Sequence, residues 1–197
     1  MYSLQTSVIV NDREYTITNN GDFRMVLDCM AAMRDDEMGE SYRTLASLLI
    51  FYNEFNSVED ITNLPQSDVE TLLKEMFKFI NCGQEDSPGA HTDYSVVDWE
   101  LDSQMICAGV NNVAKTEVRS LEYLHWWTFI GYYMSIGEST LSTVVGIRNK
   151  ICKHKKLEKW EAEFKRDNPK YFNWKSQSVE SREADRLIRE IWNNGGE

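Results

Sequence analysis

The sequence predicts a mainly α fold, a helical domain of about seven helices with a short N-terminal β-hairpin. Three observations support it. Hydrophobic residues make up 42% of the 197 residues, which is enough to bury a core. Only 3 prolines and 10 glycines occur, which disfavours a turn-rich all-β architecture. After residue 22, apolar residues recur at helical spacing. We expect a single domain over residues 1–170 and a C-terminal helical extension over residues 171–197.

Two runs rich in β-branched and aromatic residues predict the hairpin, within about residues 5–18. Val8–Val10 and Glu14–Ile17 are the expected strands, and residues 11–13 offer turn chemistry. A two-stranded sheet is marginal by itself. We therefore expect it to pack on a helix or on another chain.

Capping residues and apolar stripes predict the helices in order. Asp22 is the expected N-cap of the first helix, and Ser67–Glu70 reads as a capping box. Ser120 and Ser139 are expected to begin two later helices. The predicted helical ranges are about 23–31, 41–55, a short turn at 57–61, 67–80, 96–110, 121–136, 139–151, 155–166 and 179–192.

The helix expected at residues 121–136 is the most aromatic part of the chain. Apolar residues occupy most of its circumference, which is typical of a helix buried on several sides. Trp126 and Trp127 are about 100° apart on a helix, so they face different neighbours. We expect at least one of them to be fully buried. The alternative is that part of this aromatic surface meets another protein.

Charge is distributed unevenly along the chain. The formal net charge is −11, but residues 1–100 hold 6 Lys and Arg against 19 Asp and Glu, whereas residues 148–175 hold 10 basic against 4 acidic residues. Nucleic acid is an unlikely partner for so acidic a chain. An acidic protein, or the acidic part of a second copy, complements the basic segment better. The candidate partner surface consists of Arg148, Lys150, Lys153, Lys155 and Lys156. Reversing the charge of the last three is expected to dissociate a weak, salt-sensitive homo-oligomer, unless these lysines only solvate a helix.

Catalytic and cofactor signatures do not occur. Glycine-rich nucleotide-binding motifs and nucleophile motifs are missing, and the three histidines are isolated from one another and from metal-ligand spacing. We predict no enzyme activity, no cofactor, no metal and no catalytic residue. The four cysteines are far apart, which favours free thiols in a reducing cytosol. Neither a signal peptide nor a membrane span is expected.

Several segments, taken in chain order, resemble the "gene product fifteen" family of tailed bacteriophages and prophages. The most specific is Leu124–Phe129, in which the family-motif and core residues are Leu124, His125, Trp126, Trp127 and Phe129. The supporting segments are Asn11–Tyr15, Asp22–Arg24, Phe79–Gly83, Tyr94–Ser95 and Ile147–Lys150. The resemblance covers most of residues 5–170.

The resemblance implies a non-enzymatic role in tail assembly. The family is encoded between the major tail protein and the tape-measure protein of long-tailed phages of Gram-positive bacteria. That position implies a chaperone-like viral protein of the host bacterial cytoplasm, with the tape-measure protein as partner and possibly the major tail protein as well. Two alternatives remain open. One is a structural virion component, such as a head–tail connector or tail-completion protein. The other is a DNA-binding regulator that uses residues 148–175.

Overall fold

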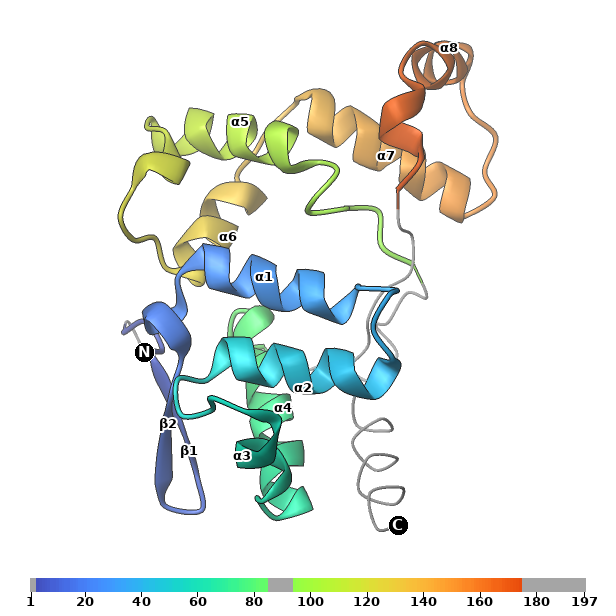
Figure 1. Cartoon of the computed structure of the whole chain (residues 1–197). Coiled ribbons are helices and arrows are strands. Elements are labelled where there is room, and N and C mark those ends of the chain that lie inside the picture. The colour runs from blue at the N-terminus through green and yellow to red at the C-terminus, as the bar shows by residue number, and fades with distance from the viewer. Residues whose placement is uncertain (1–2, 85–93, 175–197) are drawn as a thin grey trace. The chain divides into compact units, whose positions relative to one another are not determined.

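The computed structural model describes residues 3–84 and 94–174, and it is mainly helical (Figure 1). Within these ranges the chain forms eight α-helices and one two-stranded antiparallel sheet, so the predicted fold class is confirmed. The sequence predicts one helical domain over residues 1–170, whereas the contacts form two compact units. Of the described residues, the first unit holds 3–84 and 123–128, and the second holds 94–122 and 129–174. The helix predicted at residues 179–192 lies outside the described residues.

The hairpin pairs β1 (Ser7–Val10) with β2 (Arg13–Thr16), and Val8 stands opposite Tyr15. Both residues of the turn, Asn11 and Asp12, have left-handed φ values of 50° and 61°. This is the type I′ arrangement, whose twist matches that of the flanking strands. The Asn11 amide donates a hydrogen bond of 2.7 Å to Asp68 on helix α4 (Gln66–Ile80). The predicted hairpin is thus confirmed, and it packs on a helix of its own unit.

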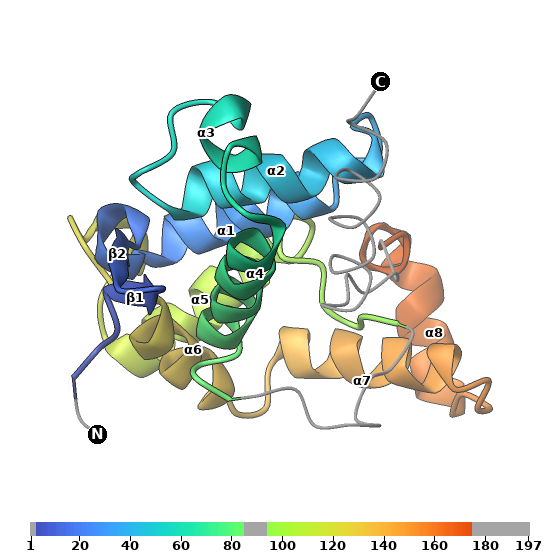
Figure 2. The same ribbon diagram turned by 90° about the horizontal axis from the view of Figure 1, so that it is seen from below.

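The remainder of the first unit is formed by α1 (Phe23–Met33), α2 (Glu40–Phe51), α3 (Val58–Thr62) and α4 (Gln66–Ile80). Helices α1 and α2 pack side by side, as Figures 1 and 2 show. The apolar faces of these helices and the hairpin supply the core. Among its fully buried side chains are Ile17, Val26, Leu48, Leu72 and Phe79.

The caps of this unit follow the prediction in one place and depart from it in another. Asp22 caps α1, since its carboxylate accepts a 3.0 Å hydrogen bond from the Arg24 N–H. The predicted capping box at Ser67 is wrong. Helix α4 begins one residue earlier, at Gln66, directly after Pro65. The Ser67 hydroxyl, already inside the helix, donates to Asp68 instead.

The second unit contains α5 (Ser103–Ala114), α7 (Thr140–Cys152), α8 (Lys159–Asp167) and short 3-10 turns at Val118–Ser120 and Pro169–Phe172. Helix α6 (Trp126–Met134) has its first residues in the first unit and the remainder in the second. Ser139 caps α7 as predicted: its hydroxyl accepts from the Ser142 N–H, and its own N–H donates to the Ser142 hydroxyl.

Three helices start later than predicted, two of them because side-chain hydrogen bonds hold the backbone before them and one because of a left-handed residue. Residues 96–102 do not enter α5, since the Asp98 N–H donates to the Asp102 carboxylate at 3.0 Å. Residues 121–125 do not enter α6, since the Leu124 N–H donates to the Asp22 carboxylate and the Leu124 carbonyl accepts from the Phe23 N–H, both at 2.9 Å. Before α8, the left-handed φ of His154 (51°) ends α7, and the next helix begins only at Lys159.

Candidate partner-binding surface

The aromatic motif lies mainly in the interior of the protein. Leu124, His125, Trp126 and Phe129 are buried, and Trp127 is partly exposed. The Trp126 indole donates to the Ile80 carbonyl at 2.9 Å, and the Trp127 indole donates to the Phe79 carbonyl at 2.8 Å. Carbonyls in the last turn of a helix lack intrahelical partners, so the two tryptophans satisfy the end of α4. Residues 124–127 of the motif are therefore packing elements of the first unit, and Phe129 belongs to the second.

His125 links this motif to the N-terminus. Its Nδ1 accepts a 3.0 Å hydrogen bond from the Trp127 N–H, and its Nε2 lies 3.0 Å from the Gln5 carbonyl oxygen. Only the neutral ring with its proton on Nε2 satisfies both contacts. Burial lowers the pKa of His125, which favours the same neutral form.

Arg148 is not part of an exposed surface, and this corrects the expectation from charge. Its side chain is fully buried and forms an ion pair with Asp102, which is also fully buried. The guanidinium also donates to the carbonyls of Tyr171 (2.9 Å) and Val96 (3.0 Å), and it lies 4.9 Å from the centre of the Trp174 ring. Arg148 thus holds three separate stretches of the second unit together.

Lys150 is also engaged within the second unit. Its ammonium lies 2.7 Å from the Glu161 carboxylate, which further accepts a 2.8 Å bond from the Glu158 N–H at the start of α8. The hydrogen bond from Lys150 lowers the pKa of Glu161, and the bond from the Glu158 backbone adds to it. Of the five predicted surface residues, the structure leaves Lys153, Lys155 and Lys156 exposed.

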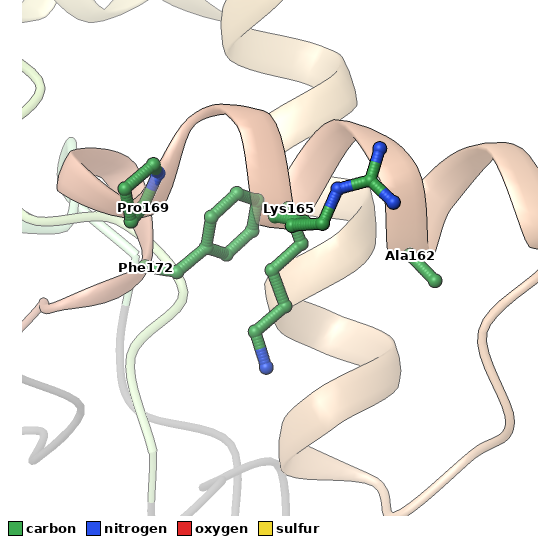
Figure 3. Close-up of a pocket in the computed structure, with 5 residues that line it drawn as sticks. Ala162, Lys165, Pro169 and Phe172 are labelled. Atoms are coloured by element: carbon green, nitrogen blue, oxygen red, sulfur yellow. The ribbon is translucent and has the colours of Figure 1, made fainter.

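The second unit also has a pocket that the sequence analysis did not identify. It has a volume of about 440 Å³ and is lined by Ala162, Lys165 and Arg166 of α8 and by Pro169 and Phe172 of the following turn (Figure 3). The Phe172 ring lies beside the stem of Lys165 in this view. Positions 162, 165 and 166 have the spacing of residues on one helix face, and this spacing is the sequence signal that could have identified the pocket. The pocket combines two cations with apolar and aromatic surface.

Among residues 3–84 and 94–174, no cluster of His, Cys, Asp and Glu could hold a metal ion. Cys29 is buried in the first unit, and burial raises the pKa of its thiol far above the ordinary value. Over the same ranges no helix has both the length and the apolar composition needed to cross a membrane.

Comparison with known proteins assigns the family. No curated protein and no solved structure matched the chain. The family model described as "Bacteriophage Gp15 protein" matches residues 2–172, which includes both units. This family comprises structural or assembly proteins of phages and is not a known enzyme family. The resemblance seen in the sequence is therefore confirmed, and the chain belongs to the bacteriophage Gp15 family.

Proposed function

We propose that the protein is a non-enzymatic assembly factor of a phage or prophage tail, which binds the tape-measure protein while the tail tube polymerises. The observation that carries this proposal is the family match over residues 2–172. The family resemblance implies a gene encoded between those of the major tail protein and the tape-measure protein, and this implied gene position supports the choice of partner.

The physical chemistry of the chain is compatible with this role. A long helical protein rich in apolar stretches aggregates when its faces are left bare. A binder with a net charge of −11 lends solubility to the complex. Many weak contacts along one client permit tight overall binding and still allow stepwise displacement by the polymerising tube.

Exposed side chains suited to such contacts occur in both units. Ile9 and Tyr42 of the first unit are 72% and 66% exposed, and Met134 and Trp160 of the second are 75% and 55% exposed. Large apolar side chains at the surface are typical contact residues when they meet a partner. These four residues are the contacts we propose for the client.

The structure weakens the case for a DNA-binding regulator. Of the basic residues in the segment 148–175, Arg148 is buried against Asp102, and Lys150 is paired with Glu161. Two of the cations that would track a phosphate backbone are therefore already neutralised. A structural component of the virion remains the principal alternative, because family membership alone is equally compatible with it.

Co-expression with the tape-measure protein of the same phage tests the proposal. We expect the soluble fraction of the tape-measure protein to rise, and a quadruple Ile9→Ser, Tyr42→Ser, Met134→Ser, Trp160→Ser variant to lose this effect. A Lys→Ser change at the exposed residues Lys153, Lys155 and Lys156 is the matched control. Purified virions separate the alternatives, since an assembly factor is lost from them and a structural component remains. A client whose solubility does not change would refute the chaperone role.

A further inference from the structure

We propose that copies of the protein associate head to tail, with the acidic bend of one copy docked in the α8 pocket of the next. The acidic bend is the exposed segment Asp36–Met38, which connects α1 to α2 in the first unit. The α8 pocket is the 440 Å³ site of the second unit shown in Figure 3. This inference goes beyond the proposed function and does not depend on a client.

The lining of the α8 pocket specifies the chemistry of its occupant. Arg166 already pairs with its neighbour Asp167 at 2.9 Å, whereas no acidic group within residues 3–84 and 94–174 forms an ion pair with Lys165. Lys165 is exposed, and it lines the pocket together with the half-buried Phe172 (Figure 3). A carboxylate next to a flexible apolar side chain would satisfy both groups.

The acidic bend presents this combination. Asp36 and Glu37 are exposed carboxylates, and Met38 is 38% exposed. A Met thioether adapts to irregular surfaces and makes favourable contacts with aromatic rings, so Met38 suits Phe172. Glu37 directly precedes Met38, so its carboxylate can meet the Lys165 ammonium when Met38 contacts Phe172. The pocket is open to solvent, and its volume of about 440 Å³ leaves room for the Met38 and Glu37 side chains at the surface.

The bend is also held in shape before it binds. The Glu37 N–H donates to the Asp35 carboxylate at 2.9 Å, and the Met38 N–H donates to the Asp35 carbonyl at 3.2 Å. Arg43 of α2 donates to the Met38 carbonyl at 3.0 Å. A segment that is ordered in advance loses less conformational entropy on docking.

The contact joins two different surfaces, so it is heterologous and repeats from copy to copy. Such contacts close into rings or extend as filaments. The acidic charge of residues 1–100 and the basic charge of residues 148–175 steer the encounter in the same direction. Since exposed charges are screened beyond about 8 Å at physiological salt, the association is expected to be weak and to decrease as salt rises.

Sedimentation velocity of the full-length protein over a concentration series, at about 0.02 M and 0.5 M salt, tests this docking. We expect self-association at low salt, and Lys165→Glu and Glu37→Lys each to raise the dissociation constant about tenfold. The double variant Glu37→Lys/Lys165→Glu exchanges the two charges and is expected to restore association. Lys155→Glu is the matched comparison, since it makes the same charge change at an exposed lysine of the basic segment outside the pocket. Docking in the α8 pocket predicts a smaller loss from Lys155→Glu than from Lys165→Glu, whereas association through Lys153, Lys155 and Lys156 predicts a loss at least as large.

Three results would overturn the inference: a monomer under all conditions, equal weakening by Lys155→Glu and Lys165→Glu, or a charge exchange without recovery. Circular dichroism confirms that each variant is folded, which is expected because all the substituted side chains are exposed. Because no client is present, failure here leaves the client-solubility experiment unaffected, and failure there leaves this one unaffected.

Discussion

Replacing Arg148 should destabilise the second unit more than any exposed substitution. The guanidinium uses all five of its N–H groups, two on the Asp102 carboxylate, two on the Tyr171 carbonyl and one on the Val96 carbonyl. Removing one partner of a buried ion pair typically costs about 3–5 kcal/mol, because the other charge remains buried and unpaired. We expect Arg148→Ala to lower the free energy of unfolding by this amount.

Arg148→Lys separates geometry from charge. An ammonium retains the charge but has three donors on one atom, so at least two of the five hydrogen bonds are lost. Hydrogen bonds to charged groups contribute about 1.5–3 kcal/mol each, so we expect a loss of at least about 3 kcal/mol. Because domain stability is about 5–15 kcal/mol, either loss is readily measurable.

Urea denaturation followed by circular dichroism measures both effects. Arg166→Lys is the control, since Arg166 is 71% exposed and pairs only with its neighbour Asp167, and we expect no measurable change from it. The double variant Asp102→Leu/Arg148→Met, which replaces the whole pair by apolar groups, should be more stable than Arg148→Ala. If Arg148→Lys and Arg148→Ala both unfold at the wild-type urea concentration, the interpretation of Arg148 as an internal clamp is wrong.

Three further predictions concern the first unit. Trp126→Ala should cost about 3–5 kcal/mol in urea denaturation, because the side chain is 1% exposed and holds the Ile80 carbonyl; a wild-type midpoint would contradict this. Since the folded state lowers the pKa of His125, the unfolded chain binds more protons below its own pKa of about 6.5. Stability should therefore be complete above that pH and decline as the pH falls towards the lower folded pKa, and His125→Gln should remove this part of the pH dependence. The Cys29 thiol should resist a thiol reagent in the native protein and react after denaturation, because it is buried and its pKa is raised; rapid native labelling at Cys29 would disprove it.

Local signals predicted the fold well where short-range chemistry determines it. The hairpin turn at Asn11 and Asp12, the Asp22 cap and the Ser139 cap each depend on residues close in the sequence. The later starts of α5 and α6 were not predictable in this way. They depend on hydrogen bonds between residues far apart, Leu124 with Asp22 before α6 and Val96 with Arg148 before α5, which no helical periodicity reveals.

The candidate surface shows the same limit. A run of basic residues indicated where cations occur but not which of them face solvent. Arg148 faces Asp102, 46 positions earlier in the chain, and Lys150 faces Glu161 on the following helix. Neither acidic partner stands out in the sequence. The residues of the α8 pocket, in contrast, lie close together in the sequence. They belong to a run of charged residues, and the charge pattern alone does not reveal a pocket.

The discontinuous first unit affects the order in which the chain can fold on the ribosome. Its hairpin and first four helices are synthesised by residue 80, but the His125 contact to Gln5 and the indole contacts to Phe79 and Ile80 require residues 125–127. The ribosome must therefore synthesise the whole of α5 before the first unit can be completed. A recombinant fragment that stops before residue 123 would leave the end of α4 without these donors. Any dissection of the protein into separately expressed parts has to carry residues 123–128 with the N-terminal half.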